Sequence, residues 1–188
     1  MTISETDRLH SQLSRFEDMF HGYRTEIVEG NIVMSPLRPF HNRTILEVWS
    51  QLKAQLGDDW SCVSDVAFPF SDEFEFCPDL AVIPAVEEAR NVTAYSPDLI
   101  ELVIEVVSPS SIRHDYEVKS RQYAARGLAH YLIFDPRAGH LVTRWNPGPD
   151  GYRGSDTIPY GGKAVVETDL GKLTVDTGAL PVDPEHST

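Results

Sequence analysis

Two carboxylates set into apolar runs, and a lysine on a predicted helix, are the residues of this chain best suited to chemistry. Asp79 opens the apolar run 80–83, and Glu105 lies inside the apolar run 99–107. A buried carboxylate is costly unless it is paired, hydrogen-bonded or bound to a cation. Lys119 follows in the next predicted element. Because carboxylate oxygens are ligands that Mg²⁺ prefers, and a lysine stabilises negative charge, these residues suit a metal-dependent hydrolytic site.

The stretch 99–107 predicts a strand. It is rich in Val and Ile and bounded by Ser-Pro turns, which is typical of a strand buried on both faces. Alternation divides it into two faces: Glu101, Val103, Glu105 and Val107, and Ile100, Leu102, Ile104 and Val106. Glu101 stands at the start of the strand, where it can reach solvent. Glu105 stands further inside, so its carboxylate needs a partner. Asp79, at the start of the shorter apolar run 80–83, needs a partner for the same reason.

A helix is predicted directly after this strand. Ser110 or Ser111 can cap it, and Arg126-Gly127 can end it. One helical face carries Ile112, Tyr116, Lys119 and Tyr123. A lysine in this inward stripe either extends to the edge of the domain or neutralises buried carboxylates. Asp115, one turn earlier, is a further pairing partner for Lys119.

Each of these residues also has an ordinary structural interpretation. Asp79 follows a proline and can be a turn residue. Glu105 can be a buried acid paired with an arginine, and Lys119 can pair with Asp115 on a solvated face. The whole set can also form a buried network without metal. The occurrence of all three in this order favours a site.

The motifs around these residues resemble a known family. The matching segments are Glu26–Gly30, Ser35-Pro36, His41, Pro78–Val82, Glu105–Ser110, Asp115–Lys119 and Tyr131–Pro136. They resemble the Uma-type (Uma, second type) restriction endonuclease family of the PD-(D/E)XK nuclease superfamily. The resemblance covers about residues 20 to 145, and Glu105–Ser110 is its most specific part. It implies an α/β, restriction-endonuclease-like core with a mixed central sheet flanked by helices and with extra antiparallel strands.

The resemblance also implies roles in catalysis. Asp79 and Glu105 match the two acidic motif positions, while the usual lysine position is taken by Val107. Lys119 matches a lysine that has moved to the following helix. We expect Asp79, Glu105 and the backbone carbonyl of Val107 to hold Mg²⁺, with Mn²⁺ as a substitute. Lys119 would orient the attacking water or stabilise the developing charge.

His41 and Glu26 match family positions as accessory residues. His41 opens the apolar stripe of a helix predicted over 40–56. Its ordinary interpretation, which we favour, is a neutral histidine held by a hydrogen bond. The alternative places it at the rim of the site, in contact with phosphate or a metal-bound water.

Bulk properties limit the class of protein. A chain of 188 residues is long enough for one sizeable domain. The net charge of -13 disfavours tight, metal-free nucleic-acid binding, since such binders are usually basic. Cys62 and Cys77 have no metal-ligand spacing, which predicts reduced thiols and a cytoplasmic location. We find no apolar run of signal-peptide or membrane-spanning length, so no membrane partner is expected.

The remaining pattern predicts the domain organisation. We expect an N-terminal helical extension over 1–20, one restriction-endonuclease-like domain over 21–178 and a flexible tail over 179–188. Other predicted elements are a hairpin over 25–34, a helix over 40–56 ended by Gly57, a strand over 60–70, an acidic loop over 71–76, strands over 130–135 and 140–145, a loop with a short strand over 147–162, and strands over 163–168 and 171–176.

Together these features predict a metal-dependent endonuclease that hydrolyses DNA phosphodiester bonds. Cutting both strands usually needs two active sites, so a homodimer is expected. One alternative is a non-catalytic interaction or nucleic-acid-binding module that retains the nuclease fold. A second is a metal-dependent hydrolase with another substrate.

Overall fold

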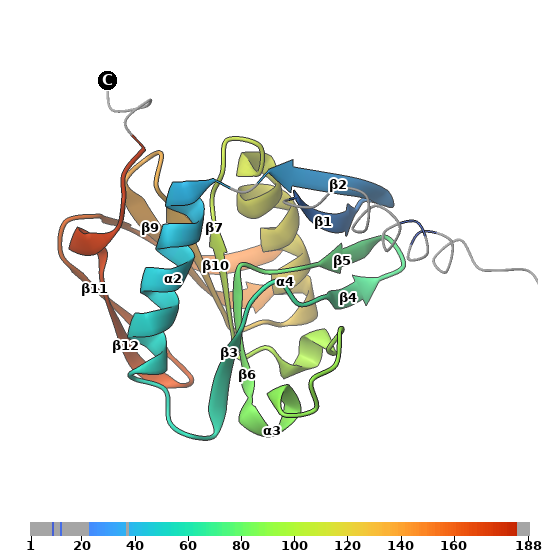
Figure 1. The fold of residues 1–188 in the computed structure, drawn as a ribbon, viewed down its shortest axis with the longest axis horizontal. Helices are drawn as coiled ribbons and strands as arrows, with labels where there is room; N and C mark the ends of the chain where they lie inside the picture. The colour runs from blue at the N-terminus through green and yellow to red at the C-terminus, as the bar shows by residue number, and fades with distance from the viewer. Residues whose placement is uncertain (1–8, 10–11, 13–22, 37, 184–188) are drawn as a thin grey trace, which may run out of the picture.

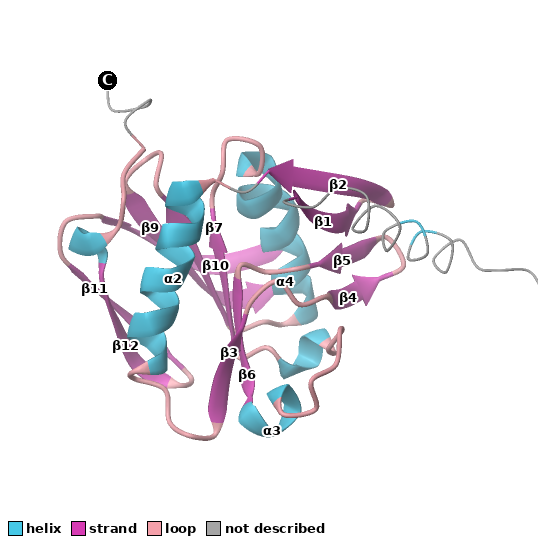
Figure 2. Cartoon of the chain, in the orientation of Figure 1, coloured by secondary structure: helices cyan, strands magenta, loops and turns pink. Residues whose placement is uncertain are grey.

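A mixed six-stranded sheet forms the centre of the molecule (Figures 1 and 2). The computed structural model describes residues 9, 12, 23–36 and 38–183. The strand order is β10-β9-β8-β7-β6-β3. The bounds are β3 Trp60–Val63, β6 Leu80–Pro84, β7 Leu102–Val106, β8 His130–Asp135, β9 His140–Gly148 and β10 Gly151–Pro159. This arrangement confirms the predicted α/β class with a mixed central sheet.

In this sheet β7 and β8 are parallel, and all other neighbouring strands are antiparallel to each other. Parallel strands need a crossover connection, here a helical one. The crossover begins with the π-helix η2 (His114–Lys119) and continues into α4 (Ser120–Arg126). The helix ends at Gly127, whose φ of 87° suits a residue without Cβ. The predicted crossover and its glycine stop are therefore confirmed.

One face of the central sheet is covered by α2 (Pro39–Lys53) and by the hairpin β11 (Lys163–Thr168)–β12 (Gly171–Asp176) (Figure 1). Pro39 stands at the start of α2, where its fixed φ favours helix initiation. This face buries Leu102, Ile104 and Val106 of β7, Leu132 and Phe134 of β8, and Val48 and Leu52 of α2. The burial of these residues fixes the position of the first turn of α2, which carries His41.

The opposite face is covered by the crossover helix and a second sheet, of order β2-β1-β5-β4. Its strands are β1 Tyr23–Val28, β2 Asn31–Pro36, β4 Phe68–Ser71 and β5 Phe74–Phe76. The turn between β1 and β2 contains Glu29 at φ 51° and Gly30 at φ 70°, as a tight hairpin requires. This side buries Phe68, Phe76, Val103, Tyr123, Tyr131 and Ile133. Short helical segments α3 (Ala85–Glu88), η1 (Pro97–Leu99) and η3 (Thr177–Ala179) are the remaining elements of the described residues.

Several predicted element bounds were wrong. The strand predicted over 60–70 is two strands in two different sheets, separated by Asp65 at φ 53°. The predicted acidic loop contains the strand β5, Phe74–Phe76. Glu75, one of its predicted solvated acids, lies between two phenylalanines in this strand and is buried. The predicted strand over 99–107 is shorter, since Pro97–Leu99 forms a 3-10 turn.

The helix α2 and the strand β10 also differ from their predicted bounds. The helix ends at Lys53 rather than beside Gly57. The segment predicted as a loop with a short strand contains the long strand β10, which pairs with β9 from Gly151 to Pro159. Gly154 is needed in this pair, since an added Cβ would lie 2.3 Å from the Trp145 indole.

The ends of the chain bear on the predicted domain organisation. The helical extension predicted over 1–20 lies outside the described residues, apart from positions 9 and 12. Leu180 packs in the same core as α2, and the Asp183 N–H donates to the carbonyl of Pro136. The chain therefore contacts the domain as far as residue 183, and the tail remains a prediction for 184–188.

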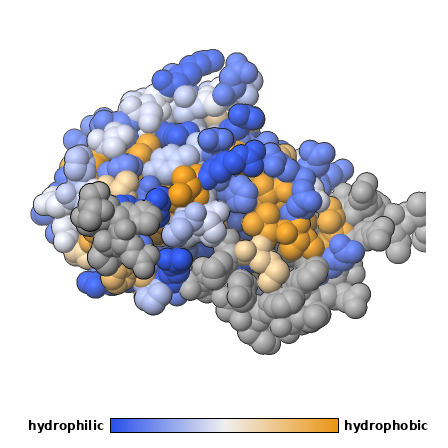
Figure 3. Space-filling model, turned by 90° about the horizontal axis from the view of Figure 1, so that it is seen from above, coloured by the Kyte–Doolittle hydropathy of each residue, from blue (hydrophilic) through white to orange (hydrophobic). Residues whose placement is uncertain are grey.

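The surface seen in Figure 3 is mainly hydrophilic, with a compact group of apolar residues at its right beside the grey residues. Strand β2 carries three half-buried apolar residues, Ile32, Val33 and Met34.

Within the described part of the chain, the helices are too short or too polar to cross a membrane.

Candidate active site

The fold brings Asp79, Glu105 and Lys119 to one small pocket. Asp79 directly precedes β6, Glu105 lies in the neighbouring strand β7, and Lys119 is the last residue of η2. The side chains are 1%, 1% and 3% exposed. The cavity between them has a volume of about 20 Å³ and is lined by Arg24, Glu26, His41, Asp79, Glu105, Val106, Ser108, Ser111, Asp115 and Lys119. A space of this size is enough for a water molecule or a metal ion.

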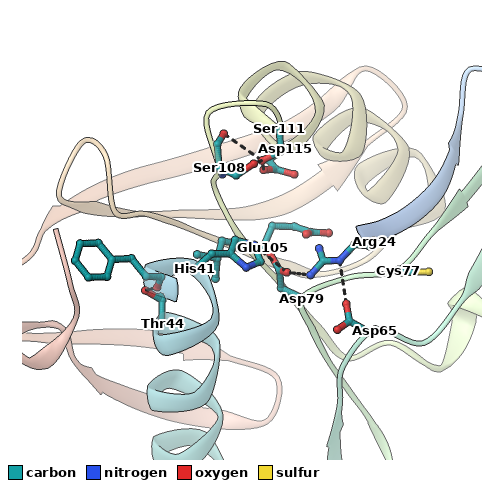
Figure 4. Close-up of polar contacts among 12 residues, drawn as sticks. Arg24, His41, Thr44, Asp65, Cys77, Asp79, Glu105, Ser108, Ser111 and Asp115 are labelled. Atoms are coloured by element: carbon teal, nitrogen blue, oxygen red, sulfur yellow. Dashed lines mark hydrogen bonds and ion pairs between the residues drawn. The ribbon is translucent and has the colours of Figure 1, made fainter. Parts of the chain in front are cut away.

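Asp79 is held from three sides (Figure 4). Its Oδ2 accepts the backbone N–H of Val106 at 2.6 Å. Its Oδ1 accepts a hydrogen bond from Nη2 of Arg24 and lies 3.2 Å from Nε2 of His41. Burial alone would raise the pKa of Asp79, but Arg24 and His41 outweigh it and hold the pKa well below its usual range. Asp79 is therefore ionised at neutral pH.

Glu105 is held by the crossover helix. Nζ of Lys119 donates to Oε1 of Glu105 at 3.0 Å, and the Tyr123 hydroxyl donates to the same oxygen at 2.7 Å. Lys119 also lies 3.0 Å from Oε1 of Glu26, whose Oε1 accepts the backbone N–H of Cys77. Lys119 and Tyr123 are one turn apart on the same helical face, which explains why both reach one carboxylate.

Asp115 is a further buried carboxylate on the same helix. Its Oδ1 lies 3.7 Å from Nζ of Lys119, and its Oδ2 accepts the hydroxyl of Ser111 at 2.5 Å. The Ser111 hydroxyl also accepts the backbone N–H of Ser108 at 2.9 Å (Figure 4). The Ser108–Ser111 segment thereby links the end of β7 to the start of the helix. The predicted pairing of Asp115 with Lys119 is confirmed, and it occurs in the interior.

The pocket holds more carboxyl groups than permanent cations. Its lining includes the carboxyl groups of Glu26, Asp79, Glu105 and Asp115, against the permanent cations Arg24 and Lys119. If all four carboxyls are ionised and His41 is neutral, two negative charges remain in excess.

The pKa shifts follow from this imbalance. Burial raises the pKa of Glu105 well above its usual range, in spite of Lys119. Burial also raises the pKa of Asp115 to about 7, against the attraction of Lys119 and the Ser111 hydrogen bond. Burial alone would lower the pKa of Lys119, but Glu105, Glu26 and Asp115 raise it, so the amine stays protonated. The site needs either protons or a further cation to be neutral.

The chemistry of the lining fits a divalent metal ion, but the side chains are not yet arranged around one. Carboxylate oxygens are hard ligands, and a doubly charged ion would balance the two excess negative charges of the fully ionised pocket. In the described residues, no group of three or more His, Cys, Asp or Glu side chains forms a metal-binding arrangement. The contacts explain this: Arg24 lies against Asp79, and Lys119 lies against Glu105. Metal binding therefore requires a local rearrangement.

The predicted site residues occupy different places in this arrangement. Glu26 and His41 line the pocket with Asp79, Glu105 and Lys119. Lys119 contacts Glu105, whereas the cation beside Asp79 is Arg24. Val107 is different: its neighbours Val106 and Ser108 line the pocket, while its side chain packs in the apolar core below the second sheet. A metal contact of the Val107 carbonyl remains a prediction.

Arg24 also lines the pocket, and it was not among the residues predicted for the site. Arg24 and Glu26 are two residues apart in β1, so their side chains share one face of the strand. That spacing was the available signal, since Glu26 was already a candidate. What the sequence did not show is that β1 lies beside the pocket, where Arg24 contacts Asp79 and Glu26 contacts Lys119.

The fold and the pocket define a class: a restriction-endonuclease-like α/β protein with one acid just before a central strand, a second acid in the neighbouring strand and a lysine on the crossover helix. The sequence model of the family described as "Uma2: Putative restriction endonuclease" matches residues 11–178, and the chain belongs to this family. This finding confirms the resemblance seen in the motifs.

A solved structure has a similar fold. It is described as a "putative nuclease belonging to DUF820" from Anabaena variabilis, and it is 16% identical in sequence. The match covers 76% of this chain and 79% of that chain, with a TM-score of 0.57. At this identity the likeness shows the fold alone. No curated protein matches the chain.

Proposed function

We propose that this protein is a metal-dependent endonuclease that hydrolyses DNA phosphodiester bonds, with Mg²⁺ as its metal and Mn²⁺ as a substitute. Family membership supports a nuclease. The observation that carries the metal dependence is the excess of buried carboxylates over cations in the pocket. A divalent ion would neutralise that excess and supply the charge needed to approach a phosphate.

Asp79 and Glu105 are the proposed metal ligands, with Glu26 and Asp115 as neighbouring acids. When bound, the metal would lower the pKa of a coordinated water and neutralise charge on the phosphate. Lys119 stays protonated, so we assign it to stabilising negative charge that develops on the phosphate oxygens rather than to accepting a proton. His41, fixed by Asp79 at the start of α2, is proposed to line the path of the substrate.

A cleavage assay tests this proposal. Supercoiled and linear single-stranded DNA would be incubated with Mg²⁺, with Mn²⁺ and with chelator, using wild type, Asp79→Asn and Lys119→Ala. We expect metal-dependent cutting that both substitutions abolish. Matched controls are Asp98→Asn and Lys172→Ala, at side chains 66% and 65% exposed. Competition with RNA would separate a DNA nuclease from a hydrolase with another substrate.

A second candidate function is an interaction module that keeps the nuclease fold without catalysis. The specific observation in its favour is that Arg24 and Lys119 already pair with Asp79 and Glu105, which stabilises the pocket without metal. Absence of cutting, together with absence of Mn²⁺ binding, would favour this alternative. Retained Mn²⁺ binding would favour an enzyme whose substrate was not offered.

The proposed assembly and location follow from the same function. We propose a homodimer, because cutting both DNA strands takes two active sites, and light scattering would measure the mass directly. We also propose a cytoplasmic location. Cys62 and Cys77 are both buried free thiols, which is consistent with a reducing compartment.

A further inference from the structure

Arg24 contacts one carboxylate in the interior and one at the surface. Its Nη2 donates to Oδ1 of Asp79, and its Nε lies 2.9 Å from Oδ1 of Asp65. The side chain of Asp79 is 1% exposed, whereas that of Asp65 is 54% exposed. Figure 4 shows the guanidinium between these two carboxylates. Arg24 therefore bridges the buried pocket and the solvent.

Both oxygens of Asp79 already have protein partners. Oδ2 accepts the N–H of Val106, and Oδ1 faces Arg24 and His41. A divalent ion that coordinates Asp79 must therefore replace a partner or approach beside one. The Val106 N–H is fixed in β7, and His41 is fixed in the first turn of α2. Arg24 is the partner with a long side chain and a second carboxylate within reach.

We propose that Arg24 is the residue that a divalent metal ion displaces from Asp79, and that Asp65 retains the guanidinium after the exchange. This inference rests on the proposed metal site. Without metal, Arg24 neutralises Asp79. A metal ion and a guanidinium repel one another strongly at the same buried oxygen, where water screens them little. The guanidinium can shift toward Asp65, where solvent stabilises its charge.

The contacts of Arg24 with Asp79 and Asp65 predict that Arg24→Gln and Asp65→Asn change the metal affinity in opposite directions. Arg24→Gln removes the competing cation, so we expect Mn²⁺ to bind more tightly, by on the order of tenfold. Asp65→Asn removes the outer anchor and leaves Arg24 committed to Asp79, so we expect weaker Mn²⁺ binding by a similar factor. If Arg24 only orients Asp79, both substitutions should weaken binding. The sign of the Arg24→Gln effect therefore separates displacement from simple orientation.

The experiment is a calorimetric Mn²⁺ titration of the full chain at pH 7.5. It compares wild type with Arg24→Gln, Asp65→Asn and Asp79→Asn. Arg113→Gln is the control for charge alone, because this arginine is 62% exposed and pairs with Glu29 at 3.4 Å; its affinity should equal that of wild type. Thermal unfolding without metal checks that each variant folds. If Arg24→Gln does not fold, Arg24→Met replaces it, since this side chain has a similar length and also removes the competing positive charge; tighter binding than in wild type is again expected.

The outcomes separate this inference from the proposed function. Tighter binding in Arg24→Gln and weaker binding in Asp65→Asn support displacement. Binding that is lost in Asp79→Asn but not tightened in Arg24→Gln keeps the metal site and overturns the role of Arg24. Equal binding in Asp79→Asn and wild type overturns the metal site, and so does absence of binding in every variant. In both cases the inference falls with the metal site.

Discussion

Lys119 and Glu105 form a buried ion pair, with Nζ 3.0 Å from Oε1. The pair joins the crossover helix to the central strand β7. The two side chains are 3% and 1% exposed. The helix that connects β7 to β8 is thereby attached to β7 through a charged contact in the interior. This contact should influence both stability and activity.

Replacing Lys119 with Met should destabilise the fold. The substitution leaves Glu105, Glu26 and Asp115 without their shared cation, and breaking a buried pair in this way costs about 3–5 kcal/mol. Urea unfolding at pH 7.5 would measure the loss. Lys172→Met, at an exposed pair with Glu167, should change the free energy of unfolding by less than about 1 kcal/mol. Equal effects of the two substitutions would contradict the buried pair.

Stability without metal should rise as the pH falls from about 7 toward 5. Burial raises the pKa of Asp115 to about 7, so between its unfolded pKa and that value the folded state binds more protons than the unfolded state. The stabilisation is fully present below the unfolded pKa and is lost as the pH rises to about 7. Below about pH 4 the opposite effect of Asp79, whose pKa is lowered, should reduce stability again.

Asp115→Asn tests the source of this pH dependence. The amide cannot titrate, so the difference in unfolding free energy between pH 7.5 and pH 5.5 should shrink by roughly 1–3 kcal/mol. Thermal or urea unfolding of both proteins at the two pH values gives the measurement. An unchanged difference in Asp115→Asn would place the titrating group elsewhere.

Divalent metal should stabilise the folded protein, because only folding gathers the four carboxyl groups into one pocket. At a Mn²⁺ concentration about one hundred times the dissociation constant, stabilisation should reach about 2.7 kcal/mol. Chelator should remove this gain, and Asp79→Asn should not show it. The readout is the unfolding temperature with and without Mn²⁺. A rise of equal size in Asp79→Asn would indicate binding at another site.

Gly154→Ala should destabilise the β9–β10 pair. An added Cβ would lie 2.3 Å from the indole of Trp145, and overpacking of this kind costs about 1–3 kcal/mol. The double variant with Trp145→Ala should recover part of the loss relative to the sum of the single variants. Gly57→Ala, where nothing lies within 4 Å, is the control for a glycine substitution without a clash. Additive effects in the double variant would show that the indole does not cause the strain.

The sequence by itself determined the strands β6, β7 and β8, the crossover helix and, through the family resemblance, five residues that line the pocket: Glu26, His41, Asp79, Glu105 and Lys119. Glu105 is conspicuous because a charge in a continuous Val- and Ile-rich run needs a partner, and Lys119 because it interrupts an apolar helical stripe. Such signals are local: they depend on the two-residue period of a strand and the near-four-residue period of a helix. For the same reason the hairpin 25–34, the strand 130–135 and the helix stop at Gly127 could be predicted.

Only the tertiary structure decided which cation faces which carboxylate. The pairing of Arg24 with Asp79, and of Lys119 with Glu105 and Glu26, depends on where the fold places β1 and the crossover helix relative to β6 and β7. Contacts between residues far apart in the chain leave no periodic pattern in it. The strand β10 escaped prediction for a related reason, since its polar residues are held by pairing with β9 rather than by burial of an apolar face.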